Sequence, residues 1–116
     1  MSELHNRCLY NMGDVIVEEG EPGNHIYIIE KGKVEVWKKH SDGNKKILGF
    51  LNTGQIFGEM AIIEKTKRTA TVSAIEPTVI VSIQGDRLLD ALQKSPPIIT
   101  TLIKTLITNL KNAQHK

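Results

Sequence analysis

The sequence is short of cysteine, of aromatic residues and of net charge, and each shortage excludes a class of protein. Of its 116 residues, only two phenylalanines, two tyrosines and one tryptophan are aromatic, so no ladder for stacking single-stranded nucleic acid is visible. The net charge of +2 is too small to indicate binding to nucleic acid or to a membrane surface by itself. Cys8 is the only cysteine, which excludes an intramolecular disulfide and predicts an inert thiol in a reducing cytoplasm.

Long hydrophobic runs are also missing. No apolar run reaches the ~18 residues that a membrane-spanning helix needs, and residues 1–11 lack the apolar core of a signal peptide. The four histidines are isolated and show no metal-ligand spacing, so no metal is expected. Apolar residues nevertheless make up 40% of the chain, enough for one hydrophobic core, and we expect a single domain over residues 1–116.

Residues 15–84 have the pattern of a β protein. Short segments rich in β-branched residues recur there, and in several of them apolar and polar residues alternate, as in a strand with one buried face. Turn signals with glycine separate them at intervals of about ten residues, among them Asp42-Gly43, a strong hairpin signal. The sequence predicts strands at 15–19, 25–32, 33–39, 45–50, 69–75 and 78–84. This spacing is typical of a sandwich, jelly roll or barrel, and we expect a β-roll over about residues 10–84.

The pattern changes after Gln84, and two C-terminal helices are expected over about residues 85–113. Asp86 is placed to cap a first helix over 87–93, which Ser95-Pro96-Pro97 would end before a second helix begins. The apolar side chains of the second helix recur with a helical period, at Ile99, Leu102, Ile103, Leu106, Leu110 and Ala113. Such a stripe is more often packed into a core than left as an interface, although it also allows a homodimer through this helix.

The segment 57–72 reads FGEMAIIEKTKRTATV and contains the groups that best indicate a ligand-binding site. A short helical turn beginning near Gly58 would leave backbone N–H groups without partners, and such donors bind phosphate. Gly58 lets the backbone approach a ligand closely, and the guanidinium of Arg68 can pair with two phosphate oxygens. The Glu59 carboxylate can only accept hydrogen bonds, which suits the hydroxyls of a sugar. Together these groups describe a site for a nucleotide with one negative charge; the alternative is a structural ion pair between Glu59 and Arg68.

The same residues resemble the phosphate-binding cassette of the cyclic nucleotide-binding domain family, which includes the catabolite activator protein and the regulatory subunits of the cAMP-dependent kinase. The family pattern is Phe-Gly-Glu-Leu-Ala-Leu, a short variable stretch, then Pro-Arg, a small residue and Ala-Thr-Val. The sequence has Phe57-Gly58-Glu59-Met60-Ala61-Ile62, then Arg68-Thr69-Ala70-Thr71-Val72, and its upstream glycines follow a similar rhythm. The resemblance covers about residues 10–110. It implies a mainly β fold: a double-stranded β-helix, or jelly roll, with a short phosphate-binding helix and two C-terminal helices.

The resemblance also implies a role for each residue of the cassette. Glu59 would accept the ribose 2′-hydroxyl, and Arg68 would be the charge partner of the cyclic phosphate. The backbone N–H donors to the phosphate would be those of Gly58, Met60 and Ala61. Thr69 stands where cGMP-preferring relatives tend to have threonine and cAMP-preferring kinase domains alanine, so the expected ligand is cAMP or cGMP.

The resemblance therefore implies a regulatory sensor that binds a cyclic nucleotide and shifts its C-terminal helices, rather than an enzyme. No DNA-reading helix-turn-helix, kinase, cyclase or channel segment is visible, so we expect no nucleic acid partner and an effector that is either a separate protein or a further domain. Lys67 departs from the family's usual proline and keeps an alternative open: a fold of this kind that has lost its ligand and binds protein. The third interpretation, a metal-dependent enzyme on a cupin-type jelly roll, is disfavoured by the isolated histidines.

Overall fold

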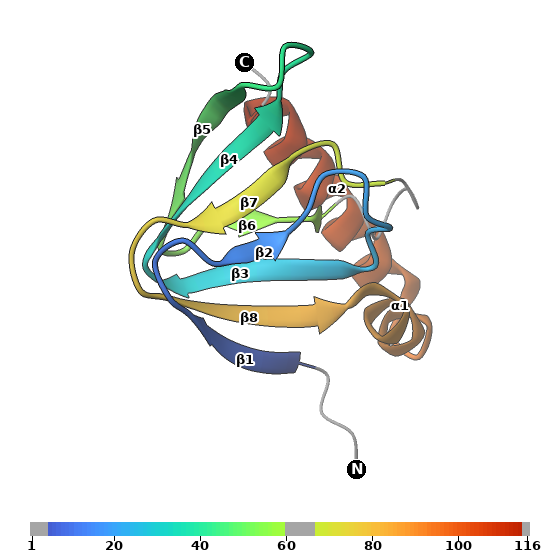
Figure 1. Ribbon diagram of the computed structural model, residues 1–116. Helices are drawn as coiled ribbons and strands as arrows, with labels where there is room; N and C mark the ends of the chain where they lie inside the picture. The colour runs from blue at the N-terminus through green and yellow to red at the C-terminus, as the bar shows by residue number, and fades with distance from the viewer. Residues whose placement is uncertain (1–4, 60–66, 115–116) are drawn as a thin grey trace.

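Two antiparallel sheets and two helices make up the structure (Figure 1). The computed structural model describes residues 5–59 and 67–114. The strands are β1 (His5–Tyr10), β2 (Val15–Val17), β3 (His25–Lys31), β4 (Lys33–Lys39), β5 (Lys45–Asn52), β6 (Ile56–Phe57), β7 (Thr71–Ala74) and β8 (Thr78–Gln84). The helices are α1 (Gly85–Gln93) and α2 (Pro97–Gln114). One sheet has the strand order β1-β8-β3-β6 and the other β2-β7-β4-β5. The fold is therefore mainly β with two C-terminal helices, which confirms the predicted fold class.

All six predicted strands are present, with ends within two residues of those expected, but β1 and β6 were not predicted. β1 pairs along its whole length with β8, from His5 opposite Ile83 to Tyr10 opposite Thr78. β6 is only two residues long and pairs with β3, where Tyr27 lies opposite Phe57. β6 ends directly before Gly58, so most of the predicted cassette follows the edge strand of this sheet.

The main hydrophobic core lies between the two sheets. Its buried side chains come from both sheets and are Val17, Ile29, Val34, Phe57, Val72 and Ile80. Ile29 of β3 and Val34 of β4 are completely buried. Burying one such side chain stabilises the fold by about 1.5–3 kcal/mol, so this cluster holds the two sheets together.

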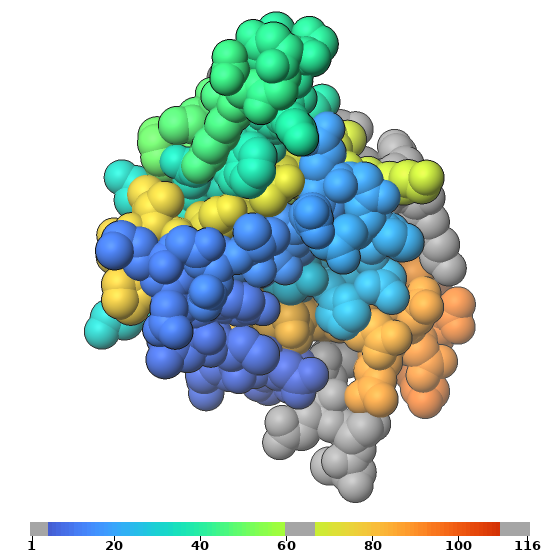
Figure 2. Space-filling model, viewed as in Figure 1, coloured from blue at the N-terminus to red at the C-terminus, as the bar shows by residue number. Residues whose placement is uncertain are grey.

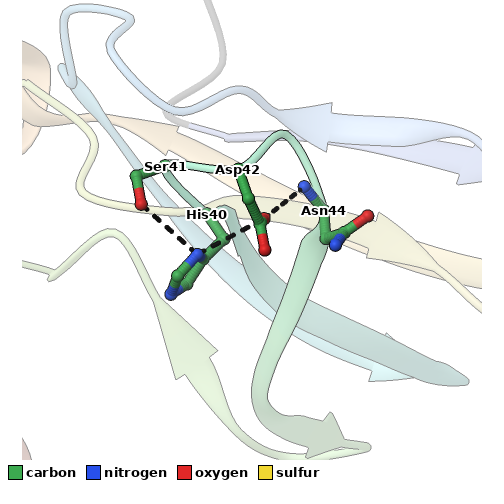
Figure 3. Close-up of polar contacts among 4 residues, drawn as sticks. All are labelled: His40, Ser41, Asp42 and Asn44. Carbon is green, nitrogen blue, oxygen red and sulfur yellow. Dashed lines mark hydrogen bonds and ion pairs between the residues drawn. The ribbon is translucent and has the colours of Figure 1, made fainter.

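The hairpin between β4 and β5 projects from one end of the molecule, as Figures 1 and 2 show. Its turn contains the predicted Asp42-Gly43 pair, and Gly43 has a φ of 87°, which a glycine adopts without strain. The Asp42 carboxylate accepts a hydrogen bond from the Asn44 backbone N–H at 2.9 Å (Figure 3). His40 Nδ1 lies 3.3 Å from the same carboxylate, so the turn is closed by its own side chains.

α1 continues directly from β8, and Asp86 is not its N-cap. The capping residue is Gln84, whose side chain makes no capping hydrogen bond, and Asp86 lies in the first helical turn. The prediction was wrong because no loop residue separates strand from helix. The backbone N–H of Gly85 instead donates to the carbonyl of Asn24 at 2.6 Å, so the loop residue just before β3 provides a partner for the first N–H of the helix.

α2 begins at Pro97, as predicted, but packs through a different face. Its buried side chain is Ile107, which joins Ile26 in a second hydrophobic cluster with partly buried Leu88, Leu89 and Ile103. Of the predicted stripe, Ile103 packs in this cluster, whereas Ile99, Leu102 and Leu106 are 38–57% exposed. Leu110 and Ala113 lie outside the residues whose side chains are described. The helix is thus rotated, so that the edge of the stripe faces the core and its centre faces solvent. Neither helix, over the residues described, has the length and hydropathy to cross a membrane.

Candidate functional site

The backbone of Arg68 is fixed by the loop between β2 and β3. Its N–H donates to the Glu21 carbonyl and its carbonyl accepts from the Gly20 N–H, both at 2.8 Å. The neighbouring Lys67 forms an isolated antiparallel bridge with Pro22. Arg68 is therefore held beside a loop that lies more than forty residues earlier in the sequence.

The guanidinium of Arg68 extends over the start of β3. Its Nη2 donates a hydrogen bond of 2.6 Å to the backbone carbonyl of His25. Its Cζ lies 5.6 Å from the centroid of the Tyr27 ring, within the range of a cation–π interaction. Tyr27 in turn stacks on Phe57 at 4.9 Å between ring centroids, so an aromatic pair that reaches into the core supports the cation.

Two glycines lie close against this guanidinium. A Cβ atom at Gly23 would lie 2.8 Å from Arg68 Cζ and Nε, and one at Gly58 would lie 2.7 Å from Nη1. Gly58 also has a φ of 74°, in the left-handed region that favours glycine. That Gly58 lets the backbone approach a ligand closely stays a prediction, because the group that lies against it here is the Arg68 side chain. Gly23 was seen in the sequence only as part of a turn, because nothing local indicates that a distant arginine lies against it.

Glu59 is 6% exposed and forms no ion pair with Arg68, although the structure describes both residues. The interpretation of these two residues as a structural ion pair is therefore wrong for this structure. The Arg68 side chain donates to the neutral His25 carbonyl and also interacts with the uncharged Tyr27 phenol, and among the described residues it forms no ion pair. A guanidinium held this way keeps its full charge available for an anionic ligand.

Of the remaining predicted site residues, the structure describes Thr69 but not Met60 or Ala61. Thr69 follows Arg68 and is exposed. Met60 and Ala61 lie outside the described residues, as does most of the short helical turn expected after Gly58. The structure thus brings Gly58 and Arg68 together, and it adds Gly23, His25 and Tyr27 to the neighbourhood of the arginine.

The electrostatics of the site favour a neutral tyrosine beside the cation. Burial raises the pKa of the Tyr27 phenol above its ordinary value, and the nearby Arg68 charge opposes part of this rise. Tyr27 is therefore protonated at neutral pH and contributes its ring face rather than a negative charge. Within residues 5–59 and 67–114, no group of three or more histidine, cysteine, aspartate or glutamate side chains is arranged to hold a metal.

Comparison with known families identifies the class of protein that this fold and site define. The family model for the cyclic nucleotide-binding domain matches residues 7–95, which is most of the chain. The chain therefore belongs to the cyclic nucleotide-binding domain family.

Its relatives include bacterial regulators and eukaryotic kinases. The chain is 29% identical over 107 residues to the cyclic AMP receptor protein of Thermus thermophilus, covering 92% of the chain and 50% of that protein. It is 46% identical over 77 residues to a cAMP-dependent protein kinase regulatory subunit of Debaryomyces hansenii, covering 66% of the chain and 16% of that protein. The chain thus spans half or less of the length of these relatives.

Solved structures show the same fold. The catabolite activator protein of Thermus thermophilus superposes with a TM-score of 0.77 at 28% identity, covering 95% of the chain and 52% of that protein. The cAMP-bound form of the EAL enzyme Bd1971 superposes with a TM-score of 0.70 at 30% identity, covering 93% of the chain and 29% of that protein. In that enzyme the similar region is less than a third of the whole chain, so the fold also occurs as part of larger proteins.

Proposed function

We propose that this chain is a regulatory sensor that binds cAMP or cGMP and transmits binding through its C-terminal helices. The observation that carries the proposal is the Arg68 guanidinium: half-buried, supported by Tyr27, and without an ion-pair partner among the described residues. Placed beside Gly58 and the buried Glu59, this cation provides the charge that a cyclic phosphate requires.

Each residue of the cassette takes a separate part in this proposal. Arg68 pairs with the phosphate, and Glu59 accepts the ribose 2′-hydroxyl. The backbone N–H groups that donate to the phosphate are those of Gly58, Met60 and Ala61. Thr69, which is exposed, offers its hydroxyl to the phosphate or to the 2-amino group of guanine. The ligand class is supported by relatives named for cAMP and for cGMP, among them cGMP-dependent protein kinase 2 of Rattus norvegicus, 41% identical over 66 residues.

The output of the sensor is a shift in the position of α1 and α2. Ligand can move these helices only if it binds more tightly to one helix arrangement than to another. The effector is a separate protein or a further domain, as in the longer relatives, and the chain itself acts without catalysis and without a metal. The exposed and unpaired Cys8 thiol fits the cytoplasmic location expected from the sequence.

Calorimetric titration with cAMP, cGMP and 5′-AMP tests the binding step. We expect a cyclic nucleotide to bind the wild type, and Arg68→Ala to weaken that binding by about 10–200-fold, since a hydrogen bond to a charged group contributes ~1.5–3 kcal/mol. Arg7→Ala is the matched control, because the Arg7 side chain is 61% exposed and forms an ion pair with Glu30 on the surface. Wild-type protein that binds none of the three nucleotides would remove the sensor function and favour the ligand-free interaction module.

A second candidate function is self-association through α2. Four apolar side chains of this helix are exposed: Ile98, Ile99, Leu102 and Leu106. A surface helix normally packs its apolar residues against the core, so this exposed group indicates an interaction surface. We propose a second copy of the chain as the partner for this surface. Leu102→Glu should then convert a dimer to a monomer in sedimentation analysis, whereas Thr108→Glu, at an exposed polar position on the opposite side of the same helix, should leave it dimeric. A wild type that is monomeric at all concentrations would exclude this arrangement.

A further inference from the structure

Five consecutive residues, 23–27, lie between the Arg68 site and the two helices. They form the end of the loop after β2 and the start of β3, and Figure 1 shows β3 beginning beside α1. The side chains of successive strand residues point to opposite faces, so Ile26 and Tyr27 of β3 contact different neighbours, whereas residues 23–25 contact theirs through the backbone.

The odd-numbered residues contact Arg68. A Cβ atom at Gly23 would lie 2.8 Å from Arg68 Cζ, so the backbone here lies directly against the guanidinium. The His25 carbonyl accepts the 2.6 Å hydrogen bond from Nη2. The Tyr27 ring lies under the cation, with its centroid 5.6 Å from Cζ.

The even-numbered residues contact the helices. The Asn24 carbonyl accepts the hydrogen bond from the N–H of Gly85, the first residue of α1, at 2.6 Å. Ile26 is 5% exposed and packs in the cluster that contains Ile107 of α2 together with Leu88 of α1. The side chains of Asn24 and His25 are also in contact, with 2.6 Å between Oδ1 and Nδ1.

We propose that residues 23–27 transmit the position of Arg68 to α1 and α2. Gly23, His25 and Tyr27 position the guanidinium, and Asn24 and Ile26 hold the helices. The Asn24 and His25 carbonyls belong to adjoining planar peptide units that share the His25 Cα. The pairing of His25 with Gln84 of β8 limits how far the φ and ψ of His25 can change to absorb a tilt of one unit, so the other unit must move with it. The inference rests on the proposed function, because a bound phosphate is the group that would draw Arg68 away from the His25 carbonyl.

The test is an amide NMR comparison of the ligand-free 116-residue chain with three single variants and one double variant. Gly23→Ala places a Cβ against Arg68, whereas Gly49→Ala is the matched control. Neither glycine has a left-handed φ, and a Cβ at Gly49 would meet no atom within 4 Å. Arg68→Ala removes the guanidinium, and the double variant combines Gly23→Ala with Arg68→Ala.

We expect the Gly85 amide resonance to shift in Gly23→Ala and in Arg68→Ala but not in Gly49→Ala. Adding Gly23→Ala to Arg68→Ala should cause no further shift, because the methyl group then has no guanidinium to displace. A Gly85 resonance that stays in place in either single variant overturns the proposal. So does a Gly23→Ala shift that persists without Arg68, because the loop would then act on α1 directly.

These results do not depend on nucleotide binding, so the inference and the proposed function can fail separately. A protein that binds no cyclic nucleotide but shows the expected Gly85 shifts would remove the sensor and keep the route from Arg68 to α1. If a nucleotide does bind, it should move the Gly85 resonance in Gly49→Ala as in the wild type. A nucleotide that binds tightly and leaves Gly85 in place would overturn the inference while the binding function stands.

Discussion

Replacing Gly58 with alanine should reduce stability far more than the same replacement at Gly13. Both glycines have a left-handed φ, 74° at Gly58 and 94° at Gly13, and this conformation costs an L-residue about 1–2 kcal/mol. At Gly13 a Cβ would meet nothing within 4 Å, so the backbone cost is the whole effect. At Gly58 the Cβ would also lie 2.8 Å from the His25 carbonyl oxygen, which is part of the β3 backbone and cannot rotate away. Such overpacking adds about 1–3 kcal/mol.

Thermal unfolding followed by circular dichroism measures this difference. In a small domain each kcal/mol of lost stability lowers the Tm by roughly 4–8 °C, so the Tm of Gly58→Ala should fall below that of Gly13→Ala by this amount for each additional kcal/mol. Equal Tm losses for Gly58→Ala and Gly13→Ala would refute the reasoning, because they would show that a methyl group at Gly58 finds room. The scans are then repeated with the nucleotide that binds the wild type. The stabilisation by ligand should be reduced in Gly58→Ala, where the methyl group displaces Arg68, and unchanged in Gly13→Ala.

Two further predictions concern pH and the helices. The raised pKa of Tyr27 means that the folded state holds the phenol proton more tightly than the unfolded state. The contribution of the protonated phenol to the free energy of unfolding is therefore fully present below pH 10.0 and is lost as the pH rises further. Tyr27→Phe should lessen the loss of stability in urea unfolding above that pH without abolishing it, because burial also raises the pKa of Tyr10; an unchanged pH profile would contradict the assignment. Ile107→Ala should weaken the docking of α2 by about 2–5 kcal/mol and speed amide exchange in that helix, whereas Thr101→Ala, at an exposed position away from both the core and the proposed dimer surface, should not. Equal exchange rates in the two variants would show that α2 does not pack through Ile107.

The β-roll could be predicted from the sequence because its strands carry the signal themselves. In β4, for example, the fully buried Val34 and the partly buried Val36, two residues further on, both pack in the core, and the Asp42-Gly43 turn fixes the hairpin that follows. β1 and β6 lack this signal. Almost all of β1 is exposed, and β6 has only two residues, so both are strands because of their pairing with β8 and β3.

The residues of the candidate site that stand in one sequence motif could be predicted, whereas the contacts between residues distant in the sequence could not. Arg68 and Gly58 stand in one short motif, so their residue types alone indicate an anion site. The contact of Gly23 with Arg68 depends on how the loop after β2 folds back across the sheet. The rotation of α2 has a similar origin: the apolar stripe is visible in the sequence, but which edge of it packs against Ile26 depends on a residue of β3 that is distant in the sequence.

The unequal size of the two hydrophobic clusters sets an energy scale for regulation. Among the described side chains, the cluster between the sheets has six buried members. The cluster between the helices and β3 has two, Ile26 and Ile107, and its other members, Leu88, Leu89 and Ile103, are only partly buried. At about 1.5–3 kcal/mol each, those two represent roughly 3–6 kcal/mol before the entropy of ordering the helices is subtracted. Reversing a two-state population from 1:99 to 99:1 requires about 5.5 kcal/mol of differential binding, a quantity of the same size. For the proposed sensor, the differential binding energy needed to move the helices is therefore comparable to what their own cluster contributes and smaller than what the core between the sheets contributes.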